Sequence, residues 1–470
     1  MMAFAAFLAL PALSSWVYGD QDAGMFAFLA WIYMFSGVIL ILMNRSQKIH
    51  LTHRDGILIT VLTWVLLSVL GAVPLYFSTN MSISLVDAFF ESVSGMTTTG
   101  ATVLTGLDHM SHGILLWRAL LQWIGGMGII VLAVAVLPFL GVGGLQLYRS
   151  EMPGVTKDKL QPRLHETARL LWFVYVALTA CCAFCYWLAG MVPFDAITHS
   201  FTTLATGGFS NYDASFAAFQ SSRIEMVSII FMLVGAINFG LHFNLLRDGG
   251  MRGYFTNFEL RIFLLILLCS ILLVTTIRAY LEEGQWLSFL QTSGYNVVAI
   301  LSNTGYSTDD FSMWPPAAML VLMLLMFVGG CSGSTSGGMK VMRIVLIIKQ
   351  GMREMQRLIH PNGISHVKMD GQIVPDKVIQ SVWAFAGLYI TSFAFVSLAM
   401  AACGLDLVTA FSAAAASLTN VGPALGSVGP FEGYGHLPAV AKLILCFAML
   451  LGRLELFTIL ILFAPAFWKK

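Results

Sequence analysis

The feature that most constrains this chain is a pattern that occurs four times along it. A long apolar run is followed by a short apolar segment, a small polar turn and a second long apolar run. The long runs reach the roughly 20 residues that an α-helix needs to cross a hydrocarbon core. The short segment at 84–97 would give a helix of only about 20 Å, at 1.5 Å per residue. The pattern therefore predicts membrane-spanning helices alternating with short helices that end inside the bilayer.

The repeated pattern divides the chain into five parts. Residues 1–50 hold two extra N-terminal transmembrane helices, expected at 1–18 and 25–43. Four units follow, each made of a membrane helix, a short pore helix and a second membrane helix, at 51–150, 151–250, 251–370 and 371–470. Their helices are expected at 57–77, 84–97 and 112–139; at 167–190, 194–205 and 223–246; at 257–280, 286–302 and 316–349; and at 377–403, 406–418 and 437–463. These repeats predict an all-α polytopic membrane protein with four units around one axis.

The composition supports the membrane class. Apolar residues make up 58% of the chain and charged residues 10%, whereas a soluble chain carries about a quarter charged residues. The chain therefore lacks the polar surface to coat itself in water, and its expected surroundings are a lipid bilayer. A formal net charge of +1 argues against a nucleic-acid partner. The 7 cysteines all fall in or beside apolar runs and show no zinc-like spacing with histidine, so we expect small buried hydrophobic residues rather than a metal site.

The charge distribution indicates an orientation. Most Lys and Arg residues fall in loops on one side of the predicted helices, which the positive-inside rule assigns to the cytoplasm together with both chain termini. Residues 1–18 carry no basic segment before Asp20, which favours a membrane helix over a cleaved signal peptide. Outer loops hold acids such as Asp87, Asp309 and Asp310, which together would concentrate cations in an outer vestibule. Taken singly, each acid is equally well explained as a solvated loop residue.

A small polar turn that ends in glycine closes each short helix. The four turns are Thr98-Thr99-Gly100, Thr206-Gly207-Gly208, Asn303-Thr304-Gly305 and Asn420-Val421-Gly422. Irregular backbone inside a bilayer is tolerated only where protein buries it or a water-filled cavity satisfies it. Glycine lets carbonyl oxygens approach a ligand closely, and a ring of carbonyls can replace the hydration shell of a monovalent cation. One such turn alone would be read as a helix C-cap; four in equivalent positions predict a cation site.

Three sets of residues together carry a resemblance to a known family. They are the four turns, the run at 329–340 and the segment Leu451-Gly452-Arg453-Leu454-Glu455. In combination they resemble the Trk/Ktr/HKT superfamily of cation transporters, and within it most nearly the bacterial TrkH/TrkG potassium-uptake subunits. The resemblance covers nearly the whole chain, including the two N-terminal helices. It implies four membrane–pore–membrane units in a pseudo-fourfold arrangement.

The resemblance also implies a function and partners. It implies K⁺ uptake across the bacterial inner membrane through a channel-like pore, a homodimer, and a cytosolic nucleotide-binding TrkA-like ring that gates the pore. It implies a K⁺ selectivity filter formed by Thr98, Thr99, Gly100, Thr206, Gly207, Gly208, Asn303, Thr304, Gly305, Asn420, Val421 and Gly422. K⁺, with Rb⁺ and Na⁺ as further transported ions, would be the only metal, and we expect no cofactor and no catalytic residue. Since Gly207 and Val421 lack a hydroxyl, side-chain oxygens cannot complete a ring, and we place the weight on backbone carbonyls.

A glycine-rich run interrupts the second long helix of the third unit. Five glycines and four Ser or Thr residues within 329–340 cannot form a good helix, and the order of residues is not that of a phosphate-binding P-loop. One interpretation is a flexible link or a packing seam. The resemblance implies instead an intramembrane gating loop, formed by Gly329, Gly330, Ser332, Gly333, Ser334, Thr335, Ser336, Gly337 and Gly338.

Arg453 lies within an apolar run, where an ionised residue normally faces a cavity or a partner. It could instead extend to the cytoplasmic interface. The resemblance implies a fixed positive charge in the pore below the filter that acts as an electrostatic barrier to cations. Two other cations in apolar runs, Arg118 and Lys442, are expected to anchor the outer interface.

Two further functions remain open at this point. A secondary transporter that couples K⁺ to H⁺ or Na⁺, or a less selective monovalent cation transporter, would share the same turns. An intramembrane enzyme using a serine or cysteine of 329–340 would need a base, and none lies near that run in the sequence. We therefore do not expect an enzyme.

Overall fold

The structure of this protein is a computed structural model that describes residues 1–43, 52–79, 81–131, 160–248, 250–363, 365–369 and 371–469. Helices dominate these residues, and the only strands among them form an antiparallel hairpin of β1 (Lys368–Met369) and β2 (Gln372–Ile373). The end of the helix expected at 112–139 and the expected boundaries between residues 50 and 51 and between residues 150 and 151 lie outside the described residues.

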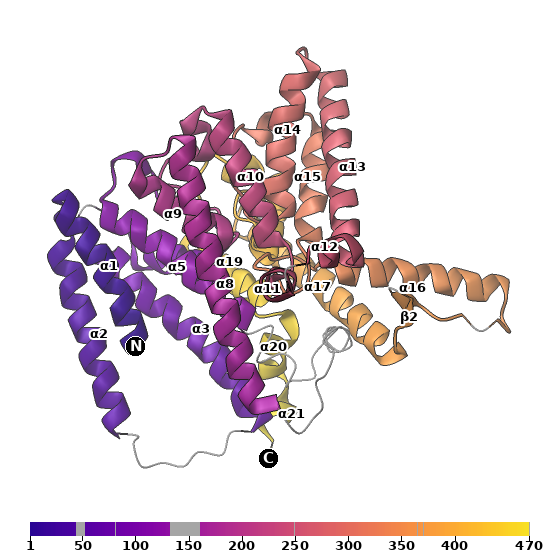
Figure 1. Cartoon of the computed structure of the whole chain (residues 1–470), viewed down its shortest axis with the longest axis horizontal. Coiled ribbons are helices and arrows are strands. Elements are labelled where there is room, and N and C mark those ends of the chain that lie inside the picture. The colour runs from indigo at the N-terminus through magenta and orange to yellow at the C-terminus, as the bar shows by residue number, and fades with distance from the viewer. Residues whose placement is uncertain are drawn as a thin grey trace.

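Two N-terminal helices lie at one edge of the molecule, drawn in indigo in Figure 1. They are α1 (Met2–Tyr18) and α2 (Ala23–Met43), and α1 packs against both α2 and the first unit. The buried carboxylate of Asp22 fixes them there, because it accepts hydrogen bonds from Ser111 Oγ at 2.6 Å and from the Thr79 amide at 2.9 Å.

Four units of long, short and long helix follow. The first is α3 (His53–Tyr76), α4 (Leu85–Met96) and α5 (His112–Val131); the second is α8 (Leu160–Ala189), α9 (Pro193–Leu204), α10 (Ser222–Ala236) and α11 (Phe239–Asp248). The third is α13 (Phe258–Leu281), α14 (Trp286–Leu301), α15 (Pro316–Val328) and α16 (Val341–Ile359); the fourth is α17 (Asp376–Ala402), α18 (Leu407–Thr419), α19 (Ala439–Arg453) and α20 (Leu456–Leu460). Short connecting helices are α12 (Arg252–Thr256), α21 (Pro465–Trp468), and the 3₁₀ turns η1 (Leu107–His109), η4 (Ser215–Phe219), η5 (Phe311–Met313), η6 (Gly426–Val428) and η7 (Ile461–Phe463).

Six of the described helices are long and apolar enough to cross a membrane, and up to eight spans result if each of two bent helix pairs is one span. The bends correct two expectations. The helix expected at 223–246 turns by 99° between α10 and α11, and the helix expected at 437–463 turns by 116° between α19 and α20. Local backbone chemistry explains both: the Asn238 side chain accepts from the Gly240 amide at 2.7 Å, and Glu455 adopts a left-handed φ of 56°.

Two of the four short helices, α4 and α18, begin with a side-chain cap, and all four are buried at their C-terminal ends. The side chain of Ser84 accepts from the Asp87 amide to start α4, Asp406 accepts from the Thr409 amide to start α18, and α9 starts at Pro193. Small residues fill the buried part of α18, where Ala413–Ala416 are fully buried. This lets the backbone of neighbouring elements approach α18 closely.

The units close into a ring in chain order. The second long helix of each unit packs against the short helix of the next: α5 on α9, α10 on α14, α15 on α18, and α19 on α4. The last contact joins the fourth unit back to the first. The predicted fold class, an all-α membrane protein with four repeated units around one axis, is confirmed.

Candidate functional site: a ring of four glycine turns

The four turns share one backbone conformation. The first residue of each turn has a left-handed φ and so does its final glycine, while the middle residue does not. The φ values are 53° at Thr98, 50° at Thr206, 57° at Asn303 and 57° at Asn420, then 84° at Gly100, 79° at Gly208, 80° at Gly305 and 94° at Gly422. In each turn the middle amide donates to the carbonyl five residues earlier, for example Thr99 to Ser94 at 2.8 Å and Val421 to Ala416 at 2.9 Å. Four sequences that differ in side chains therefore fold into one local structure.

The glycines bring the four turns together around a common centre. A Cβ placed on Gly100 would lie 2.2 Å from the Gly207 carbonyl oxygen, and one on Gly208 would lie 1.9 Å from that of Thr304. A Cβ on Gly305 would lie 2.0 Å from the Val421 oxygen, and one on Gly422 would lie 2.4 Å from the Thr99 oxygen. Each glycine thus abuts the middle carbonyl of the next turn, and the fourth contact closes the circle. No side chain fits at these positions without displacing a carbonyl.

The middle carbonyls and hydroxyls play different parts. Among the described residues, the carbonyl oxygens of Thr99, Thr304 and Val421 accept no hydrogen bond, whereas the Gly207 oxygen accepts one from Gln122 Nε2 at 2.7 Å. The Thr99 hydroxyl pairs with Thr97 Oγ1 at 2.8 Å, and the Thr304 hydroxyl with Ser302 Oγ at 2.8 Å. These hydroxyls are therefore engaged by their own short helices, and the backbone supplies the uncommitted oxygens.

Buried polar side chains hold the turns in place through hydrogen bonds. Tyr306, which follows Gly305, contacts the Thr203 hydroxyl of the second short helix at 3.1 Å. Tyr434 donates its hydroxyl to the Gly422 carbonyl at 2.7 Å, and Asn420 Nδ2 donates to Thr99 Oγ1 at 2.9 Å. The turns therefore hold one another across unit boundaries.

Two cations expected to anchor the outer interface are buried instead, so that expectation is wrong. Arg118 is 1% exposed and donates from Nε to Glu91 Oε1 at 2.8 Å; the Glu91 carboxylate also accepts from the Val103 amide at 3.0 Å. Lys442 is 5% exposed and pairs with Asp87 at 2.5 Å, which joins the fourth unit to the first. A charge inside an apolar run signals a partner, but the sequence could not identify partners so distant along the chain.

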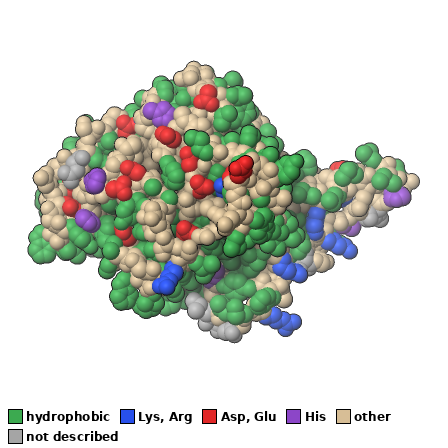
Figure 2. Space-filling view, turned by 90° about the horizontal axis from the view of Figure 1, so that it is seen from above, with side chains coloured by type: hydrophobic (Ala, Val, Ile, Leu, Met, Phe, Trp, Pro, Cys, Tyr) green, Lys and Arg blue, Asp and Glu red, His purple; other side chains and the backbone are tan. Residues whose placement is uncertain are grey.

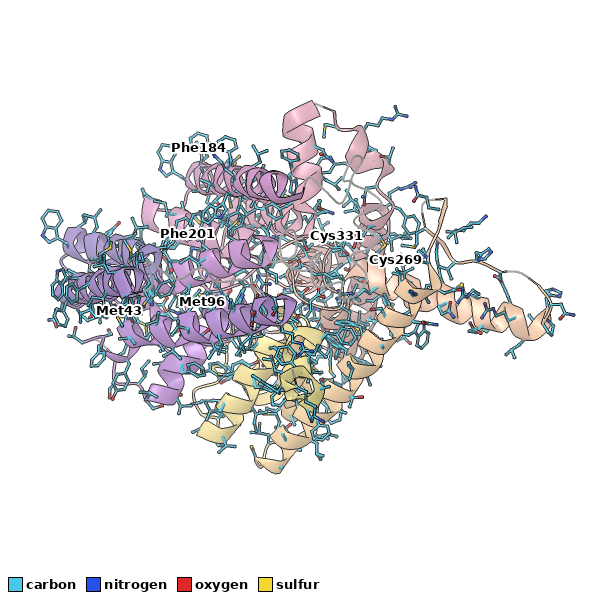
Figure 3. The ribbon with its side chains drawn as sticks, turned by 90° about the horizontal axis from the view of Figure 1, so that it is seen from below. Met43, Met96, Phe184, Phe201, Cys269 and Cys331 are labelled. Atoms are coloured by element: carbon cyan, nitrogen blue, oxygen red, sulfur yellow. The ribbon has the colours of Figure 1, made fainter. Side chains whose placement is uncertain are left out.

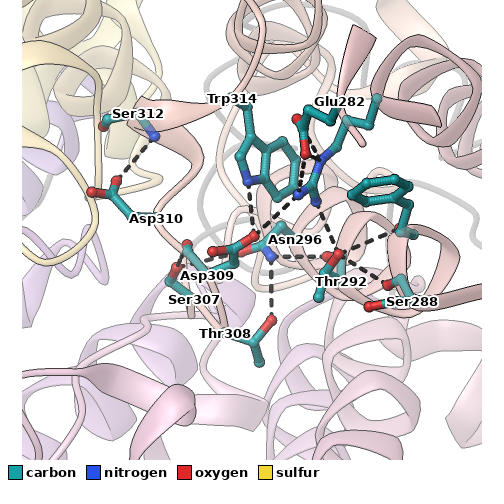
Figure 4. A network of polar contacts seen from close by, with 12 residues as sticks. Glu282, Ser288, Thr292, Asn296, Ser307, Thr308, Asp309, Asp310, Ser312 and Trp314 are labelled. Atoms are coloured by element: carbon teal, nitrogen blue, oxygen red, sulfur yellow. Dashed lines mark hydrogen bonds and ion pairs between the residues drawn. The ribbon is translucent and has the colours of Figure 1, made fainter. Parts of the chain in front are cut away.

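The acids on the loops between the helices are partly neutralised by such pairs. Figure 2 shows acidic side chains gathered over the middle of the face seen from above, with most of the visible Lys and Arg toward the projecting end. In the third unit, Arg278 lies between Glu282 and Asp309 at 3.0 and 3.4 Å, and its guanidinium lies 4.0 Å from the centre of the Trp314 ring. Figure 4 shows Glu282, Asp309 and Trp314 in one network of polar contacts. Balancing these charges weakens the negative potential that the number of acids alone would predict for this face.

The glycine-rich run lies beneath the ring of turns. The predicted interruption is present, since α15 ends at Val328 and α16 begins at Val341. The run contacts the C-terminal carbonyls of three short helices, through Thr335 Oγ1 to Leu204 at 3.1 Å, Ser336 Oγ to Ser302 at 2.6 Å, and the Gly338 amide to Thr419 at 3.0 Å. Cys331, within the run, lies near the middle of the molecule in Figure 3, whereas Met43 and Phe184 lie toward its periphery.

The bend between α10 and α11 receives one side of this run. The break leaves backbone carbonyls and amides without hydrogen-bond partners inside the helix, and the glycine-rich run supplies those partners. The Cys331 amide donates to the Ala236 carbonyl at 2.9 Å, and the Phe239 amide donates to the Gly333 carbonyl at 3.1 Å. This docking site was not visible in the sequence, where 223–246 read as one continuous helix.

The buried carboxylate of Glu259 and the basic residue Lys340 hold the run in place. Glu259, 4% exposed at the start of α13, accepts from the Ser332 amide at 2.7 Å, from Ser332 Oγ at 3.0 Å and from the Met342 amide at 3.3 Å. Lys340 donates from Nζ to the Ser336 carbonyl. Glu259 therefore binds both ends of the run, a role that the sequence analysis missed.

Arg453 contacts the same run from the fourth unit. It is 2% exposed, and it donates from Nη1 to the Thr335 carbonyl at 2.7 Å and from Nη2 to the Gly125 carbonyl at 3.3 Å. The alternative of an arginine that extends to the interface is therefore wrong. Its near neighbour Glu455 pairs instead with Arg343 at 2.7 Å.

Comparison with known proteins agrees with this architecture. The TrkH family, described as cation transport proteins, matches residues 23–470. The Trk system potassium uptake protein TrkH of Halomonas elongata is 47% identical over 472 residues, covering 100% of this chain and 97% of the relative. TrkH of Escherichia coli K12 is 44% identical over 471 residues, covering 99% of this chain and 97% of the relative. The crystal structure of the potassium transporter TrkH from Vibrio parahaemolyticus matches with a TM-score of 0.92 and 41% identity, covering 100% of this chain and 97% of that one.

The match extends over the two N-terminal helices, the four units and the glycine-rich run, and the sequence identity is well above the level at which only a fold is shared. On these grounds, this chain is a member of the TrkH family of cation transport proteins.

Proposed function

We propose that this protein takes up potassium ions across the bacterial inner membrane through a channel-like pore. The observation that carries the proposal is the closed ring, in which each turn's glycine abuts the middle carbonyl of the next turn. Carbonyl oxygens arranged in this way can replace the water around a dehydrated monovalent cation. The relatives with which the chain shares more than 40% identity are named potassium uptake proteins.

The proposed filter consists of the twelve residues of the four turns, with the backbone oxygens as ligands. The negative ends of the four short helix dipoles converge where the turns begin, which favours a cation there. Unbonded carbonyls at Thr99, Thr304 and Val421 support this assignment. No further metal or cofactor is required by this chemistry.

The proposed gate is the glycine-rich run at 329–340, with Arg453 as an electrostatic barrier. The run lies across the C-terminal ends of three short helices, and Arg453 donates directly to the Thr335 carbonyl within it. A buried positive charge next to the path would lower cation occupancy while the run stays in place. Movement of the run would then both clear the path and release the arginine.

The proposed regulator is a TrkA-like cytosolic nucleotide-binding ring acting on a homodimer. The helix α16 and the β1–β2 hairpin project from the helical body in Figure 1 and begin directly after the glycine-rich run. This helix carries cations such as the half-buried Lys349 and the exposed Arg357. A protein that binds this arm could therefore pull on the run. We propose that this arm and both termini lie in the cytoplasm, which a reporter fused to the C-terminal end would test.

The proposed function is tested with purified protein in liposomes. Uptake of ⁸⁶Rb⁺ or K⁺ is measured with Na⁺ as competitor, and reversal potentials are measured under a K⁺ gradient with and without H⁺ or Na⁺ gradients. A channel-like pore gives a reversal potential set by K⁺ alone. A dependence on the H⁺ or Na⁺ gradient would establish the coupled symporter instead, and an absence of K⁺ flux from folded protein would contradict the proposal.

A further inference from the structure

The second turn differs from the other three because its middle residue has no side chain. The middle residues are Thr99, Thr304 and Val421 in the other turns and Gly207 in the second. Gly207 is followed by Gly208, so this turn has two consecutive glycines. Glycine has more conformational freedom than any other residue, and the second turn would therefore be the least rigid part of the ring if nothing else held it.

A glutamine from the first unit occupies the space of the missing side chain. A Cβ placed on Gly207 would lie 2.4 Å from both Cδ and Oε1 of Gln122. Gln122 is fully buried, and its amide group bridges the turn on both sides of Gly208. Its Nε2 donates to the Gly207 carbonyl at 2.7 Å, and its Oε1 accepts from the Phe209 amide at 3.1 Å.

The backbone of Gly207 does not itself require glycine. Its φ lies outside the left-handed region, in contrast to Gly208 at 79°. Another residue could therefore adopt this conformation without backbone strain. Among the contacts of that position, the three nearest atoms all belong to Gln122. The glutamine side chain, rather than the turn, excludes a side chain at residue 207.

The equivalent helix position in the other units is a methionine. Gln122 lies three residues before Gly125, and Met232 and Met449 lie three before Gly235 and Gly452. Each of these glycines packs on the last carbonyls of the short helix in its own unit: Gly125 on Met96, Gly235 on Leu204 and Gly452 on Leu418.

In the third unit, Met326 holds this position, three residues before Gly329. Since each second long helix packs against the next short helix, the four pairs of helix and turn residues are Gln122 with Gly207, Met232 with Thr304, Met326 with Val421, and Met449 with Thr99.

This pairing is complementary. By position, a methionine corresponds to a β-branched middle residue in three of the four pairs, and Gln122 corresponds to a glycine in the remaining pair. Methionine can neither donate nor accept a strong hydrogen bond, whereas Gln122 does both. The other side chain that α5 sends to this turn, Arg118, donates to the Ser210 carbonyl at 3.0 Å and lies 4.2 Å from the Phe209 ring. Residues 207–210 are thus held along their length by one helix.

We propose that Gln122 is a positioning residue that sets the ion selectivity of the second turn by replacing the side chain missing from Gly207. The inference rests on the proposed function of the ring as a K⁺ filter. A filter that discriminates K⁺ from the smaller Na⁺ must prevent its carbonyls from closing around the smaller ion. Gln122 fixes the Gly207 carbonyl on one lone pair and leaves the second lone pair for the ion.

The first variant to test is Gln122→Met, which gives the first unit the residue found in the other three. K⁺ and Na⁺ uptake are measured with the full-length protein in liposomes, and the K⁺/Na⁺ ratio is compared with the wild type. The ratio is expected to fall by about fivefold to tenfold, the range that the loss of one buried hydrogen bond gives. K⁺ uptake itself is expected to persist, because three turns are unchanged.

The second variant is Gly207→Thr, and the third combines both changes. Gly207→Thr alone places a side chain where Gln122 lies and is expected to lower uptake of both ions. Gln122→Met with Gly207→Thr reproduces the Met232–Thr304 pairing in the second turn. This double variant is expected to recover both uptake and a K⁺/Na⁺ ratio close to the wild-type value, which a merely additive loss of packing would not produce.

A matched control is Gln291→Met, which removes a glutamine that donates to Ser222 at 3.1 Å and to Glu225 at 3.0 Å, away from the ring of turns. Its K⁺/Na⁺ ratio is expected to stay unchanged. A wild-type ratio in a folded Gln122→Met protein, or a double variant no better than Gly207→Thr, would overturn the inference. A wild-type protein that does not prefer K⁺ would instead overturn the proposed filter, so the two failures are distinguishable.

Discussion

Arg453 donates from Nη1 to the Thr335 carbonyl at 2.7 Å, which joins a buried guanidinium on α19 to the middle of the glycine-rich run. The two residues come from different units and are 118 positions apart. The contact means that the charge and the run cannot move independently. It also gives the first prediction.

Replacing Arg453 with alanine should raise cation flux. The change removes both a positive charge next to the path and a hydrogen bond that holds the run. A decrease of about 1.4 kcal/mol in the free-energy barrier to ion permeation would already raise the flux tenfold. ⁸⁶Rb⁺ uptake into liposomes measures the effect. Arg453→Lys keeps the charge and should give a smaller increase, and a wild-type rate in folded Arg453→Ala protein would mean that Arg453 has only a structural role.

Replacing Glu259 with alanine should release the glycine-rich run. The Ser332 and Met342 amides would lose their buried acceptor, at a cost of about 1–3 kcal/mol. Cys331, which is 1% exposed in the docked run, should then react faster with a water-soluble thiol reagent. Labelling of the Cys331 peptide is measured by mass spectrometry. Glu225→Ala serves as the control, and equal labelling of the two variants would show that Glu259 does not hold the run.

Replacing Gly305 with alanine should abolish K⁺ flux. The new Cβ would lie 2.0 Å from the Val421 carbonyl oxygen, and the φ of 80° disfavours any side chain by about 1–2 kcal/mol. The carbonyl must therefore move. Gly294→Ala on the same short helix is the control, since its Cβ would meet no atom closer than 3.9 Å. Normal K⁺ selectivity in Gly305→Ala would be incompatible with the ring as a filter.

Replacing Arg118 with alanine should destabilise the protein strongly. The change leaves the Glu91 carboxylate buried and unpaired, which costs about 3–5 kcal/mol. The apparent Tm in detergent, at a fixed scan rate, should fall more than in the double variant Arg118→Met with Glu91→Gln. That double variant removes both charges and keeps an acceptor for the Val103 amide. An equal or larger fall in the double variant would indicate that lost packing dominates.

The sequence predicted the repeated parts of this structure because repetition is a local signal. Gly100, Gly208, Gly305 and Gly422 stand at the same place after four similar short segments, and a turn that needs left-handed backbone recruits glycine each time. The interruption after Val328 was equally visible, since its glycines and hydroxyl residues cannot continue a helix.

The parts that could not be predicted depend on partners distant along the chain. Glu91 and Arg118 are 27 residues apart, and Glu259 meets Ser332 across 73 residues. Arg118 was expected to anchor the outer interface, and its spacing from Glu91 does not identify the ion pair that buries it. No sequence pattern indicated the role of Gln122, because its side chain fills the space that is left by the missing side chain of Gly207.

The bend between α10 and α11 has a consequence for any open state. The Ala236 carbonyl and the Phe239 amide are satisfied only by the docked run among the described residues, and the carbonyls of Leu204, Ser302 and Thr419 also bond to it. If the run departs as proposed for the gate, these groups would face a cavity, and each group left dry would cost about 1–3 kcal/mol. Water would then have to enter as the run leaves, so that hydration of the cavity and opening of the pore would become a single event.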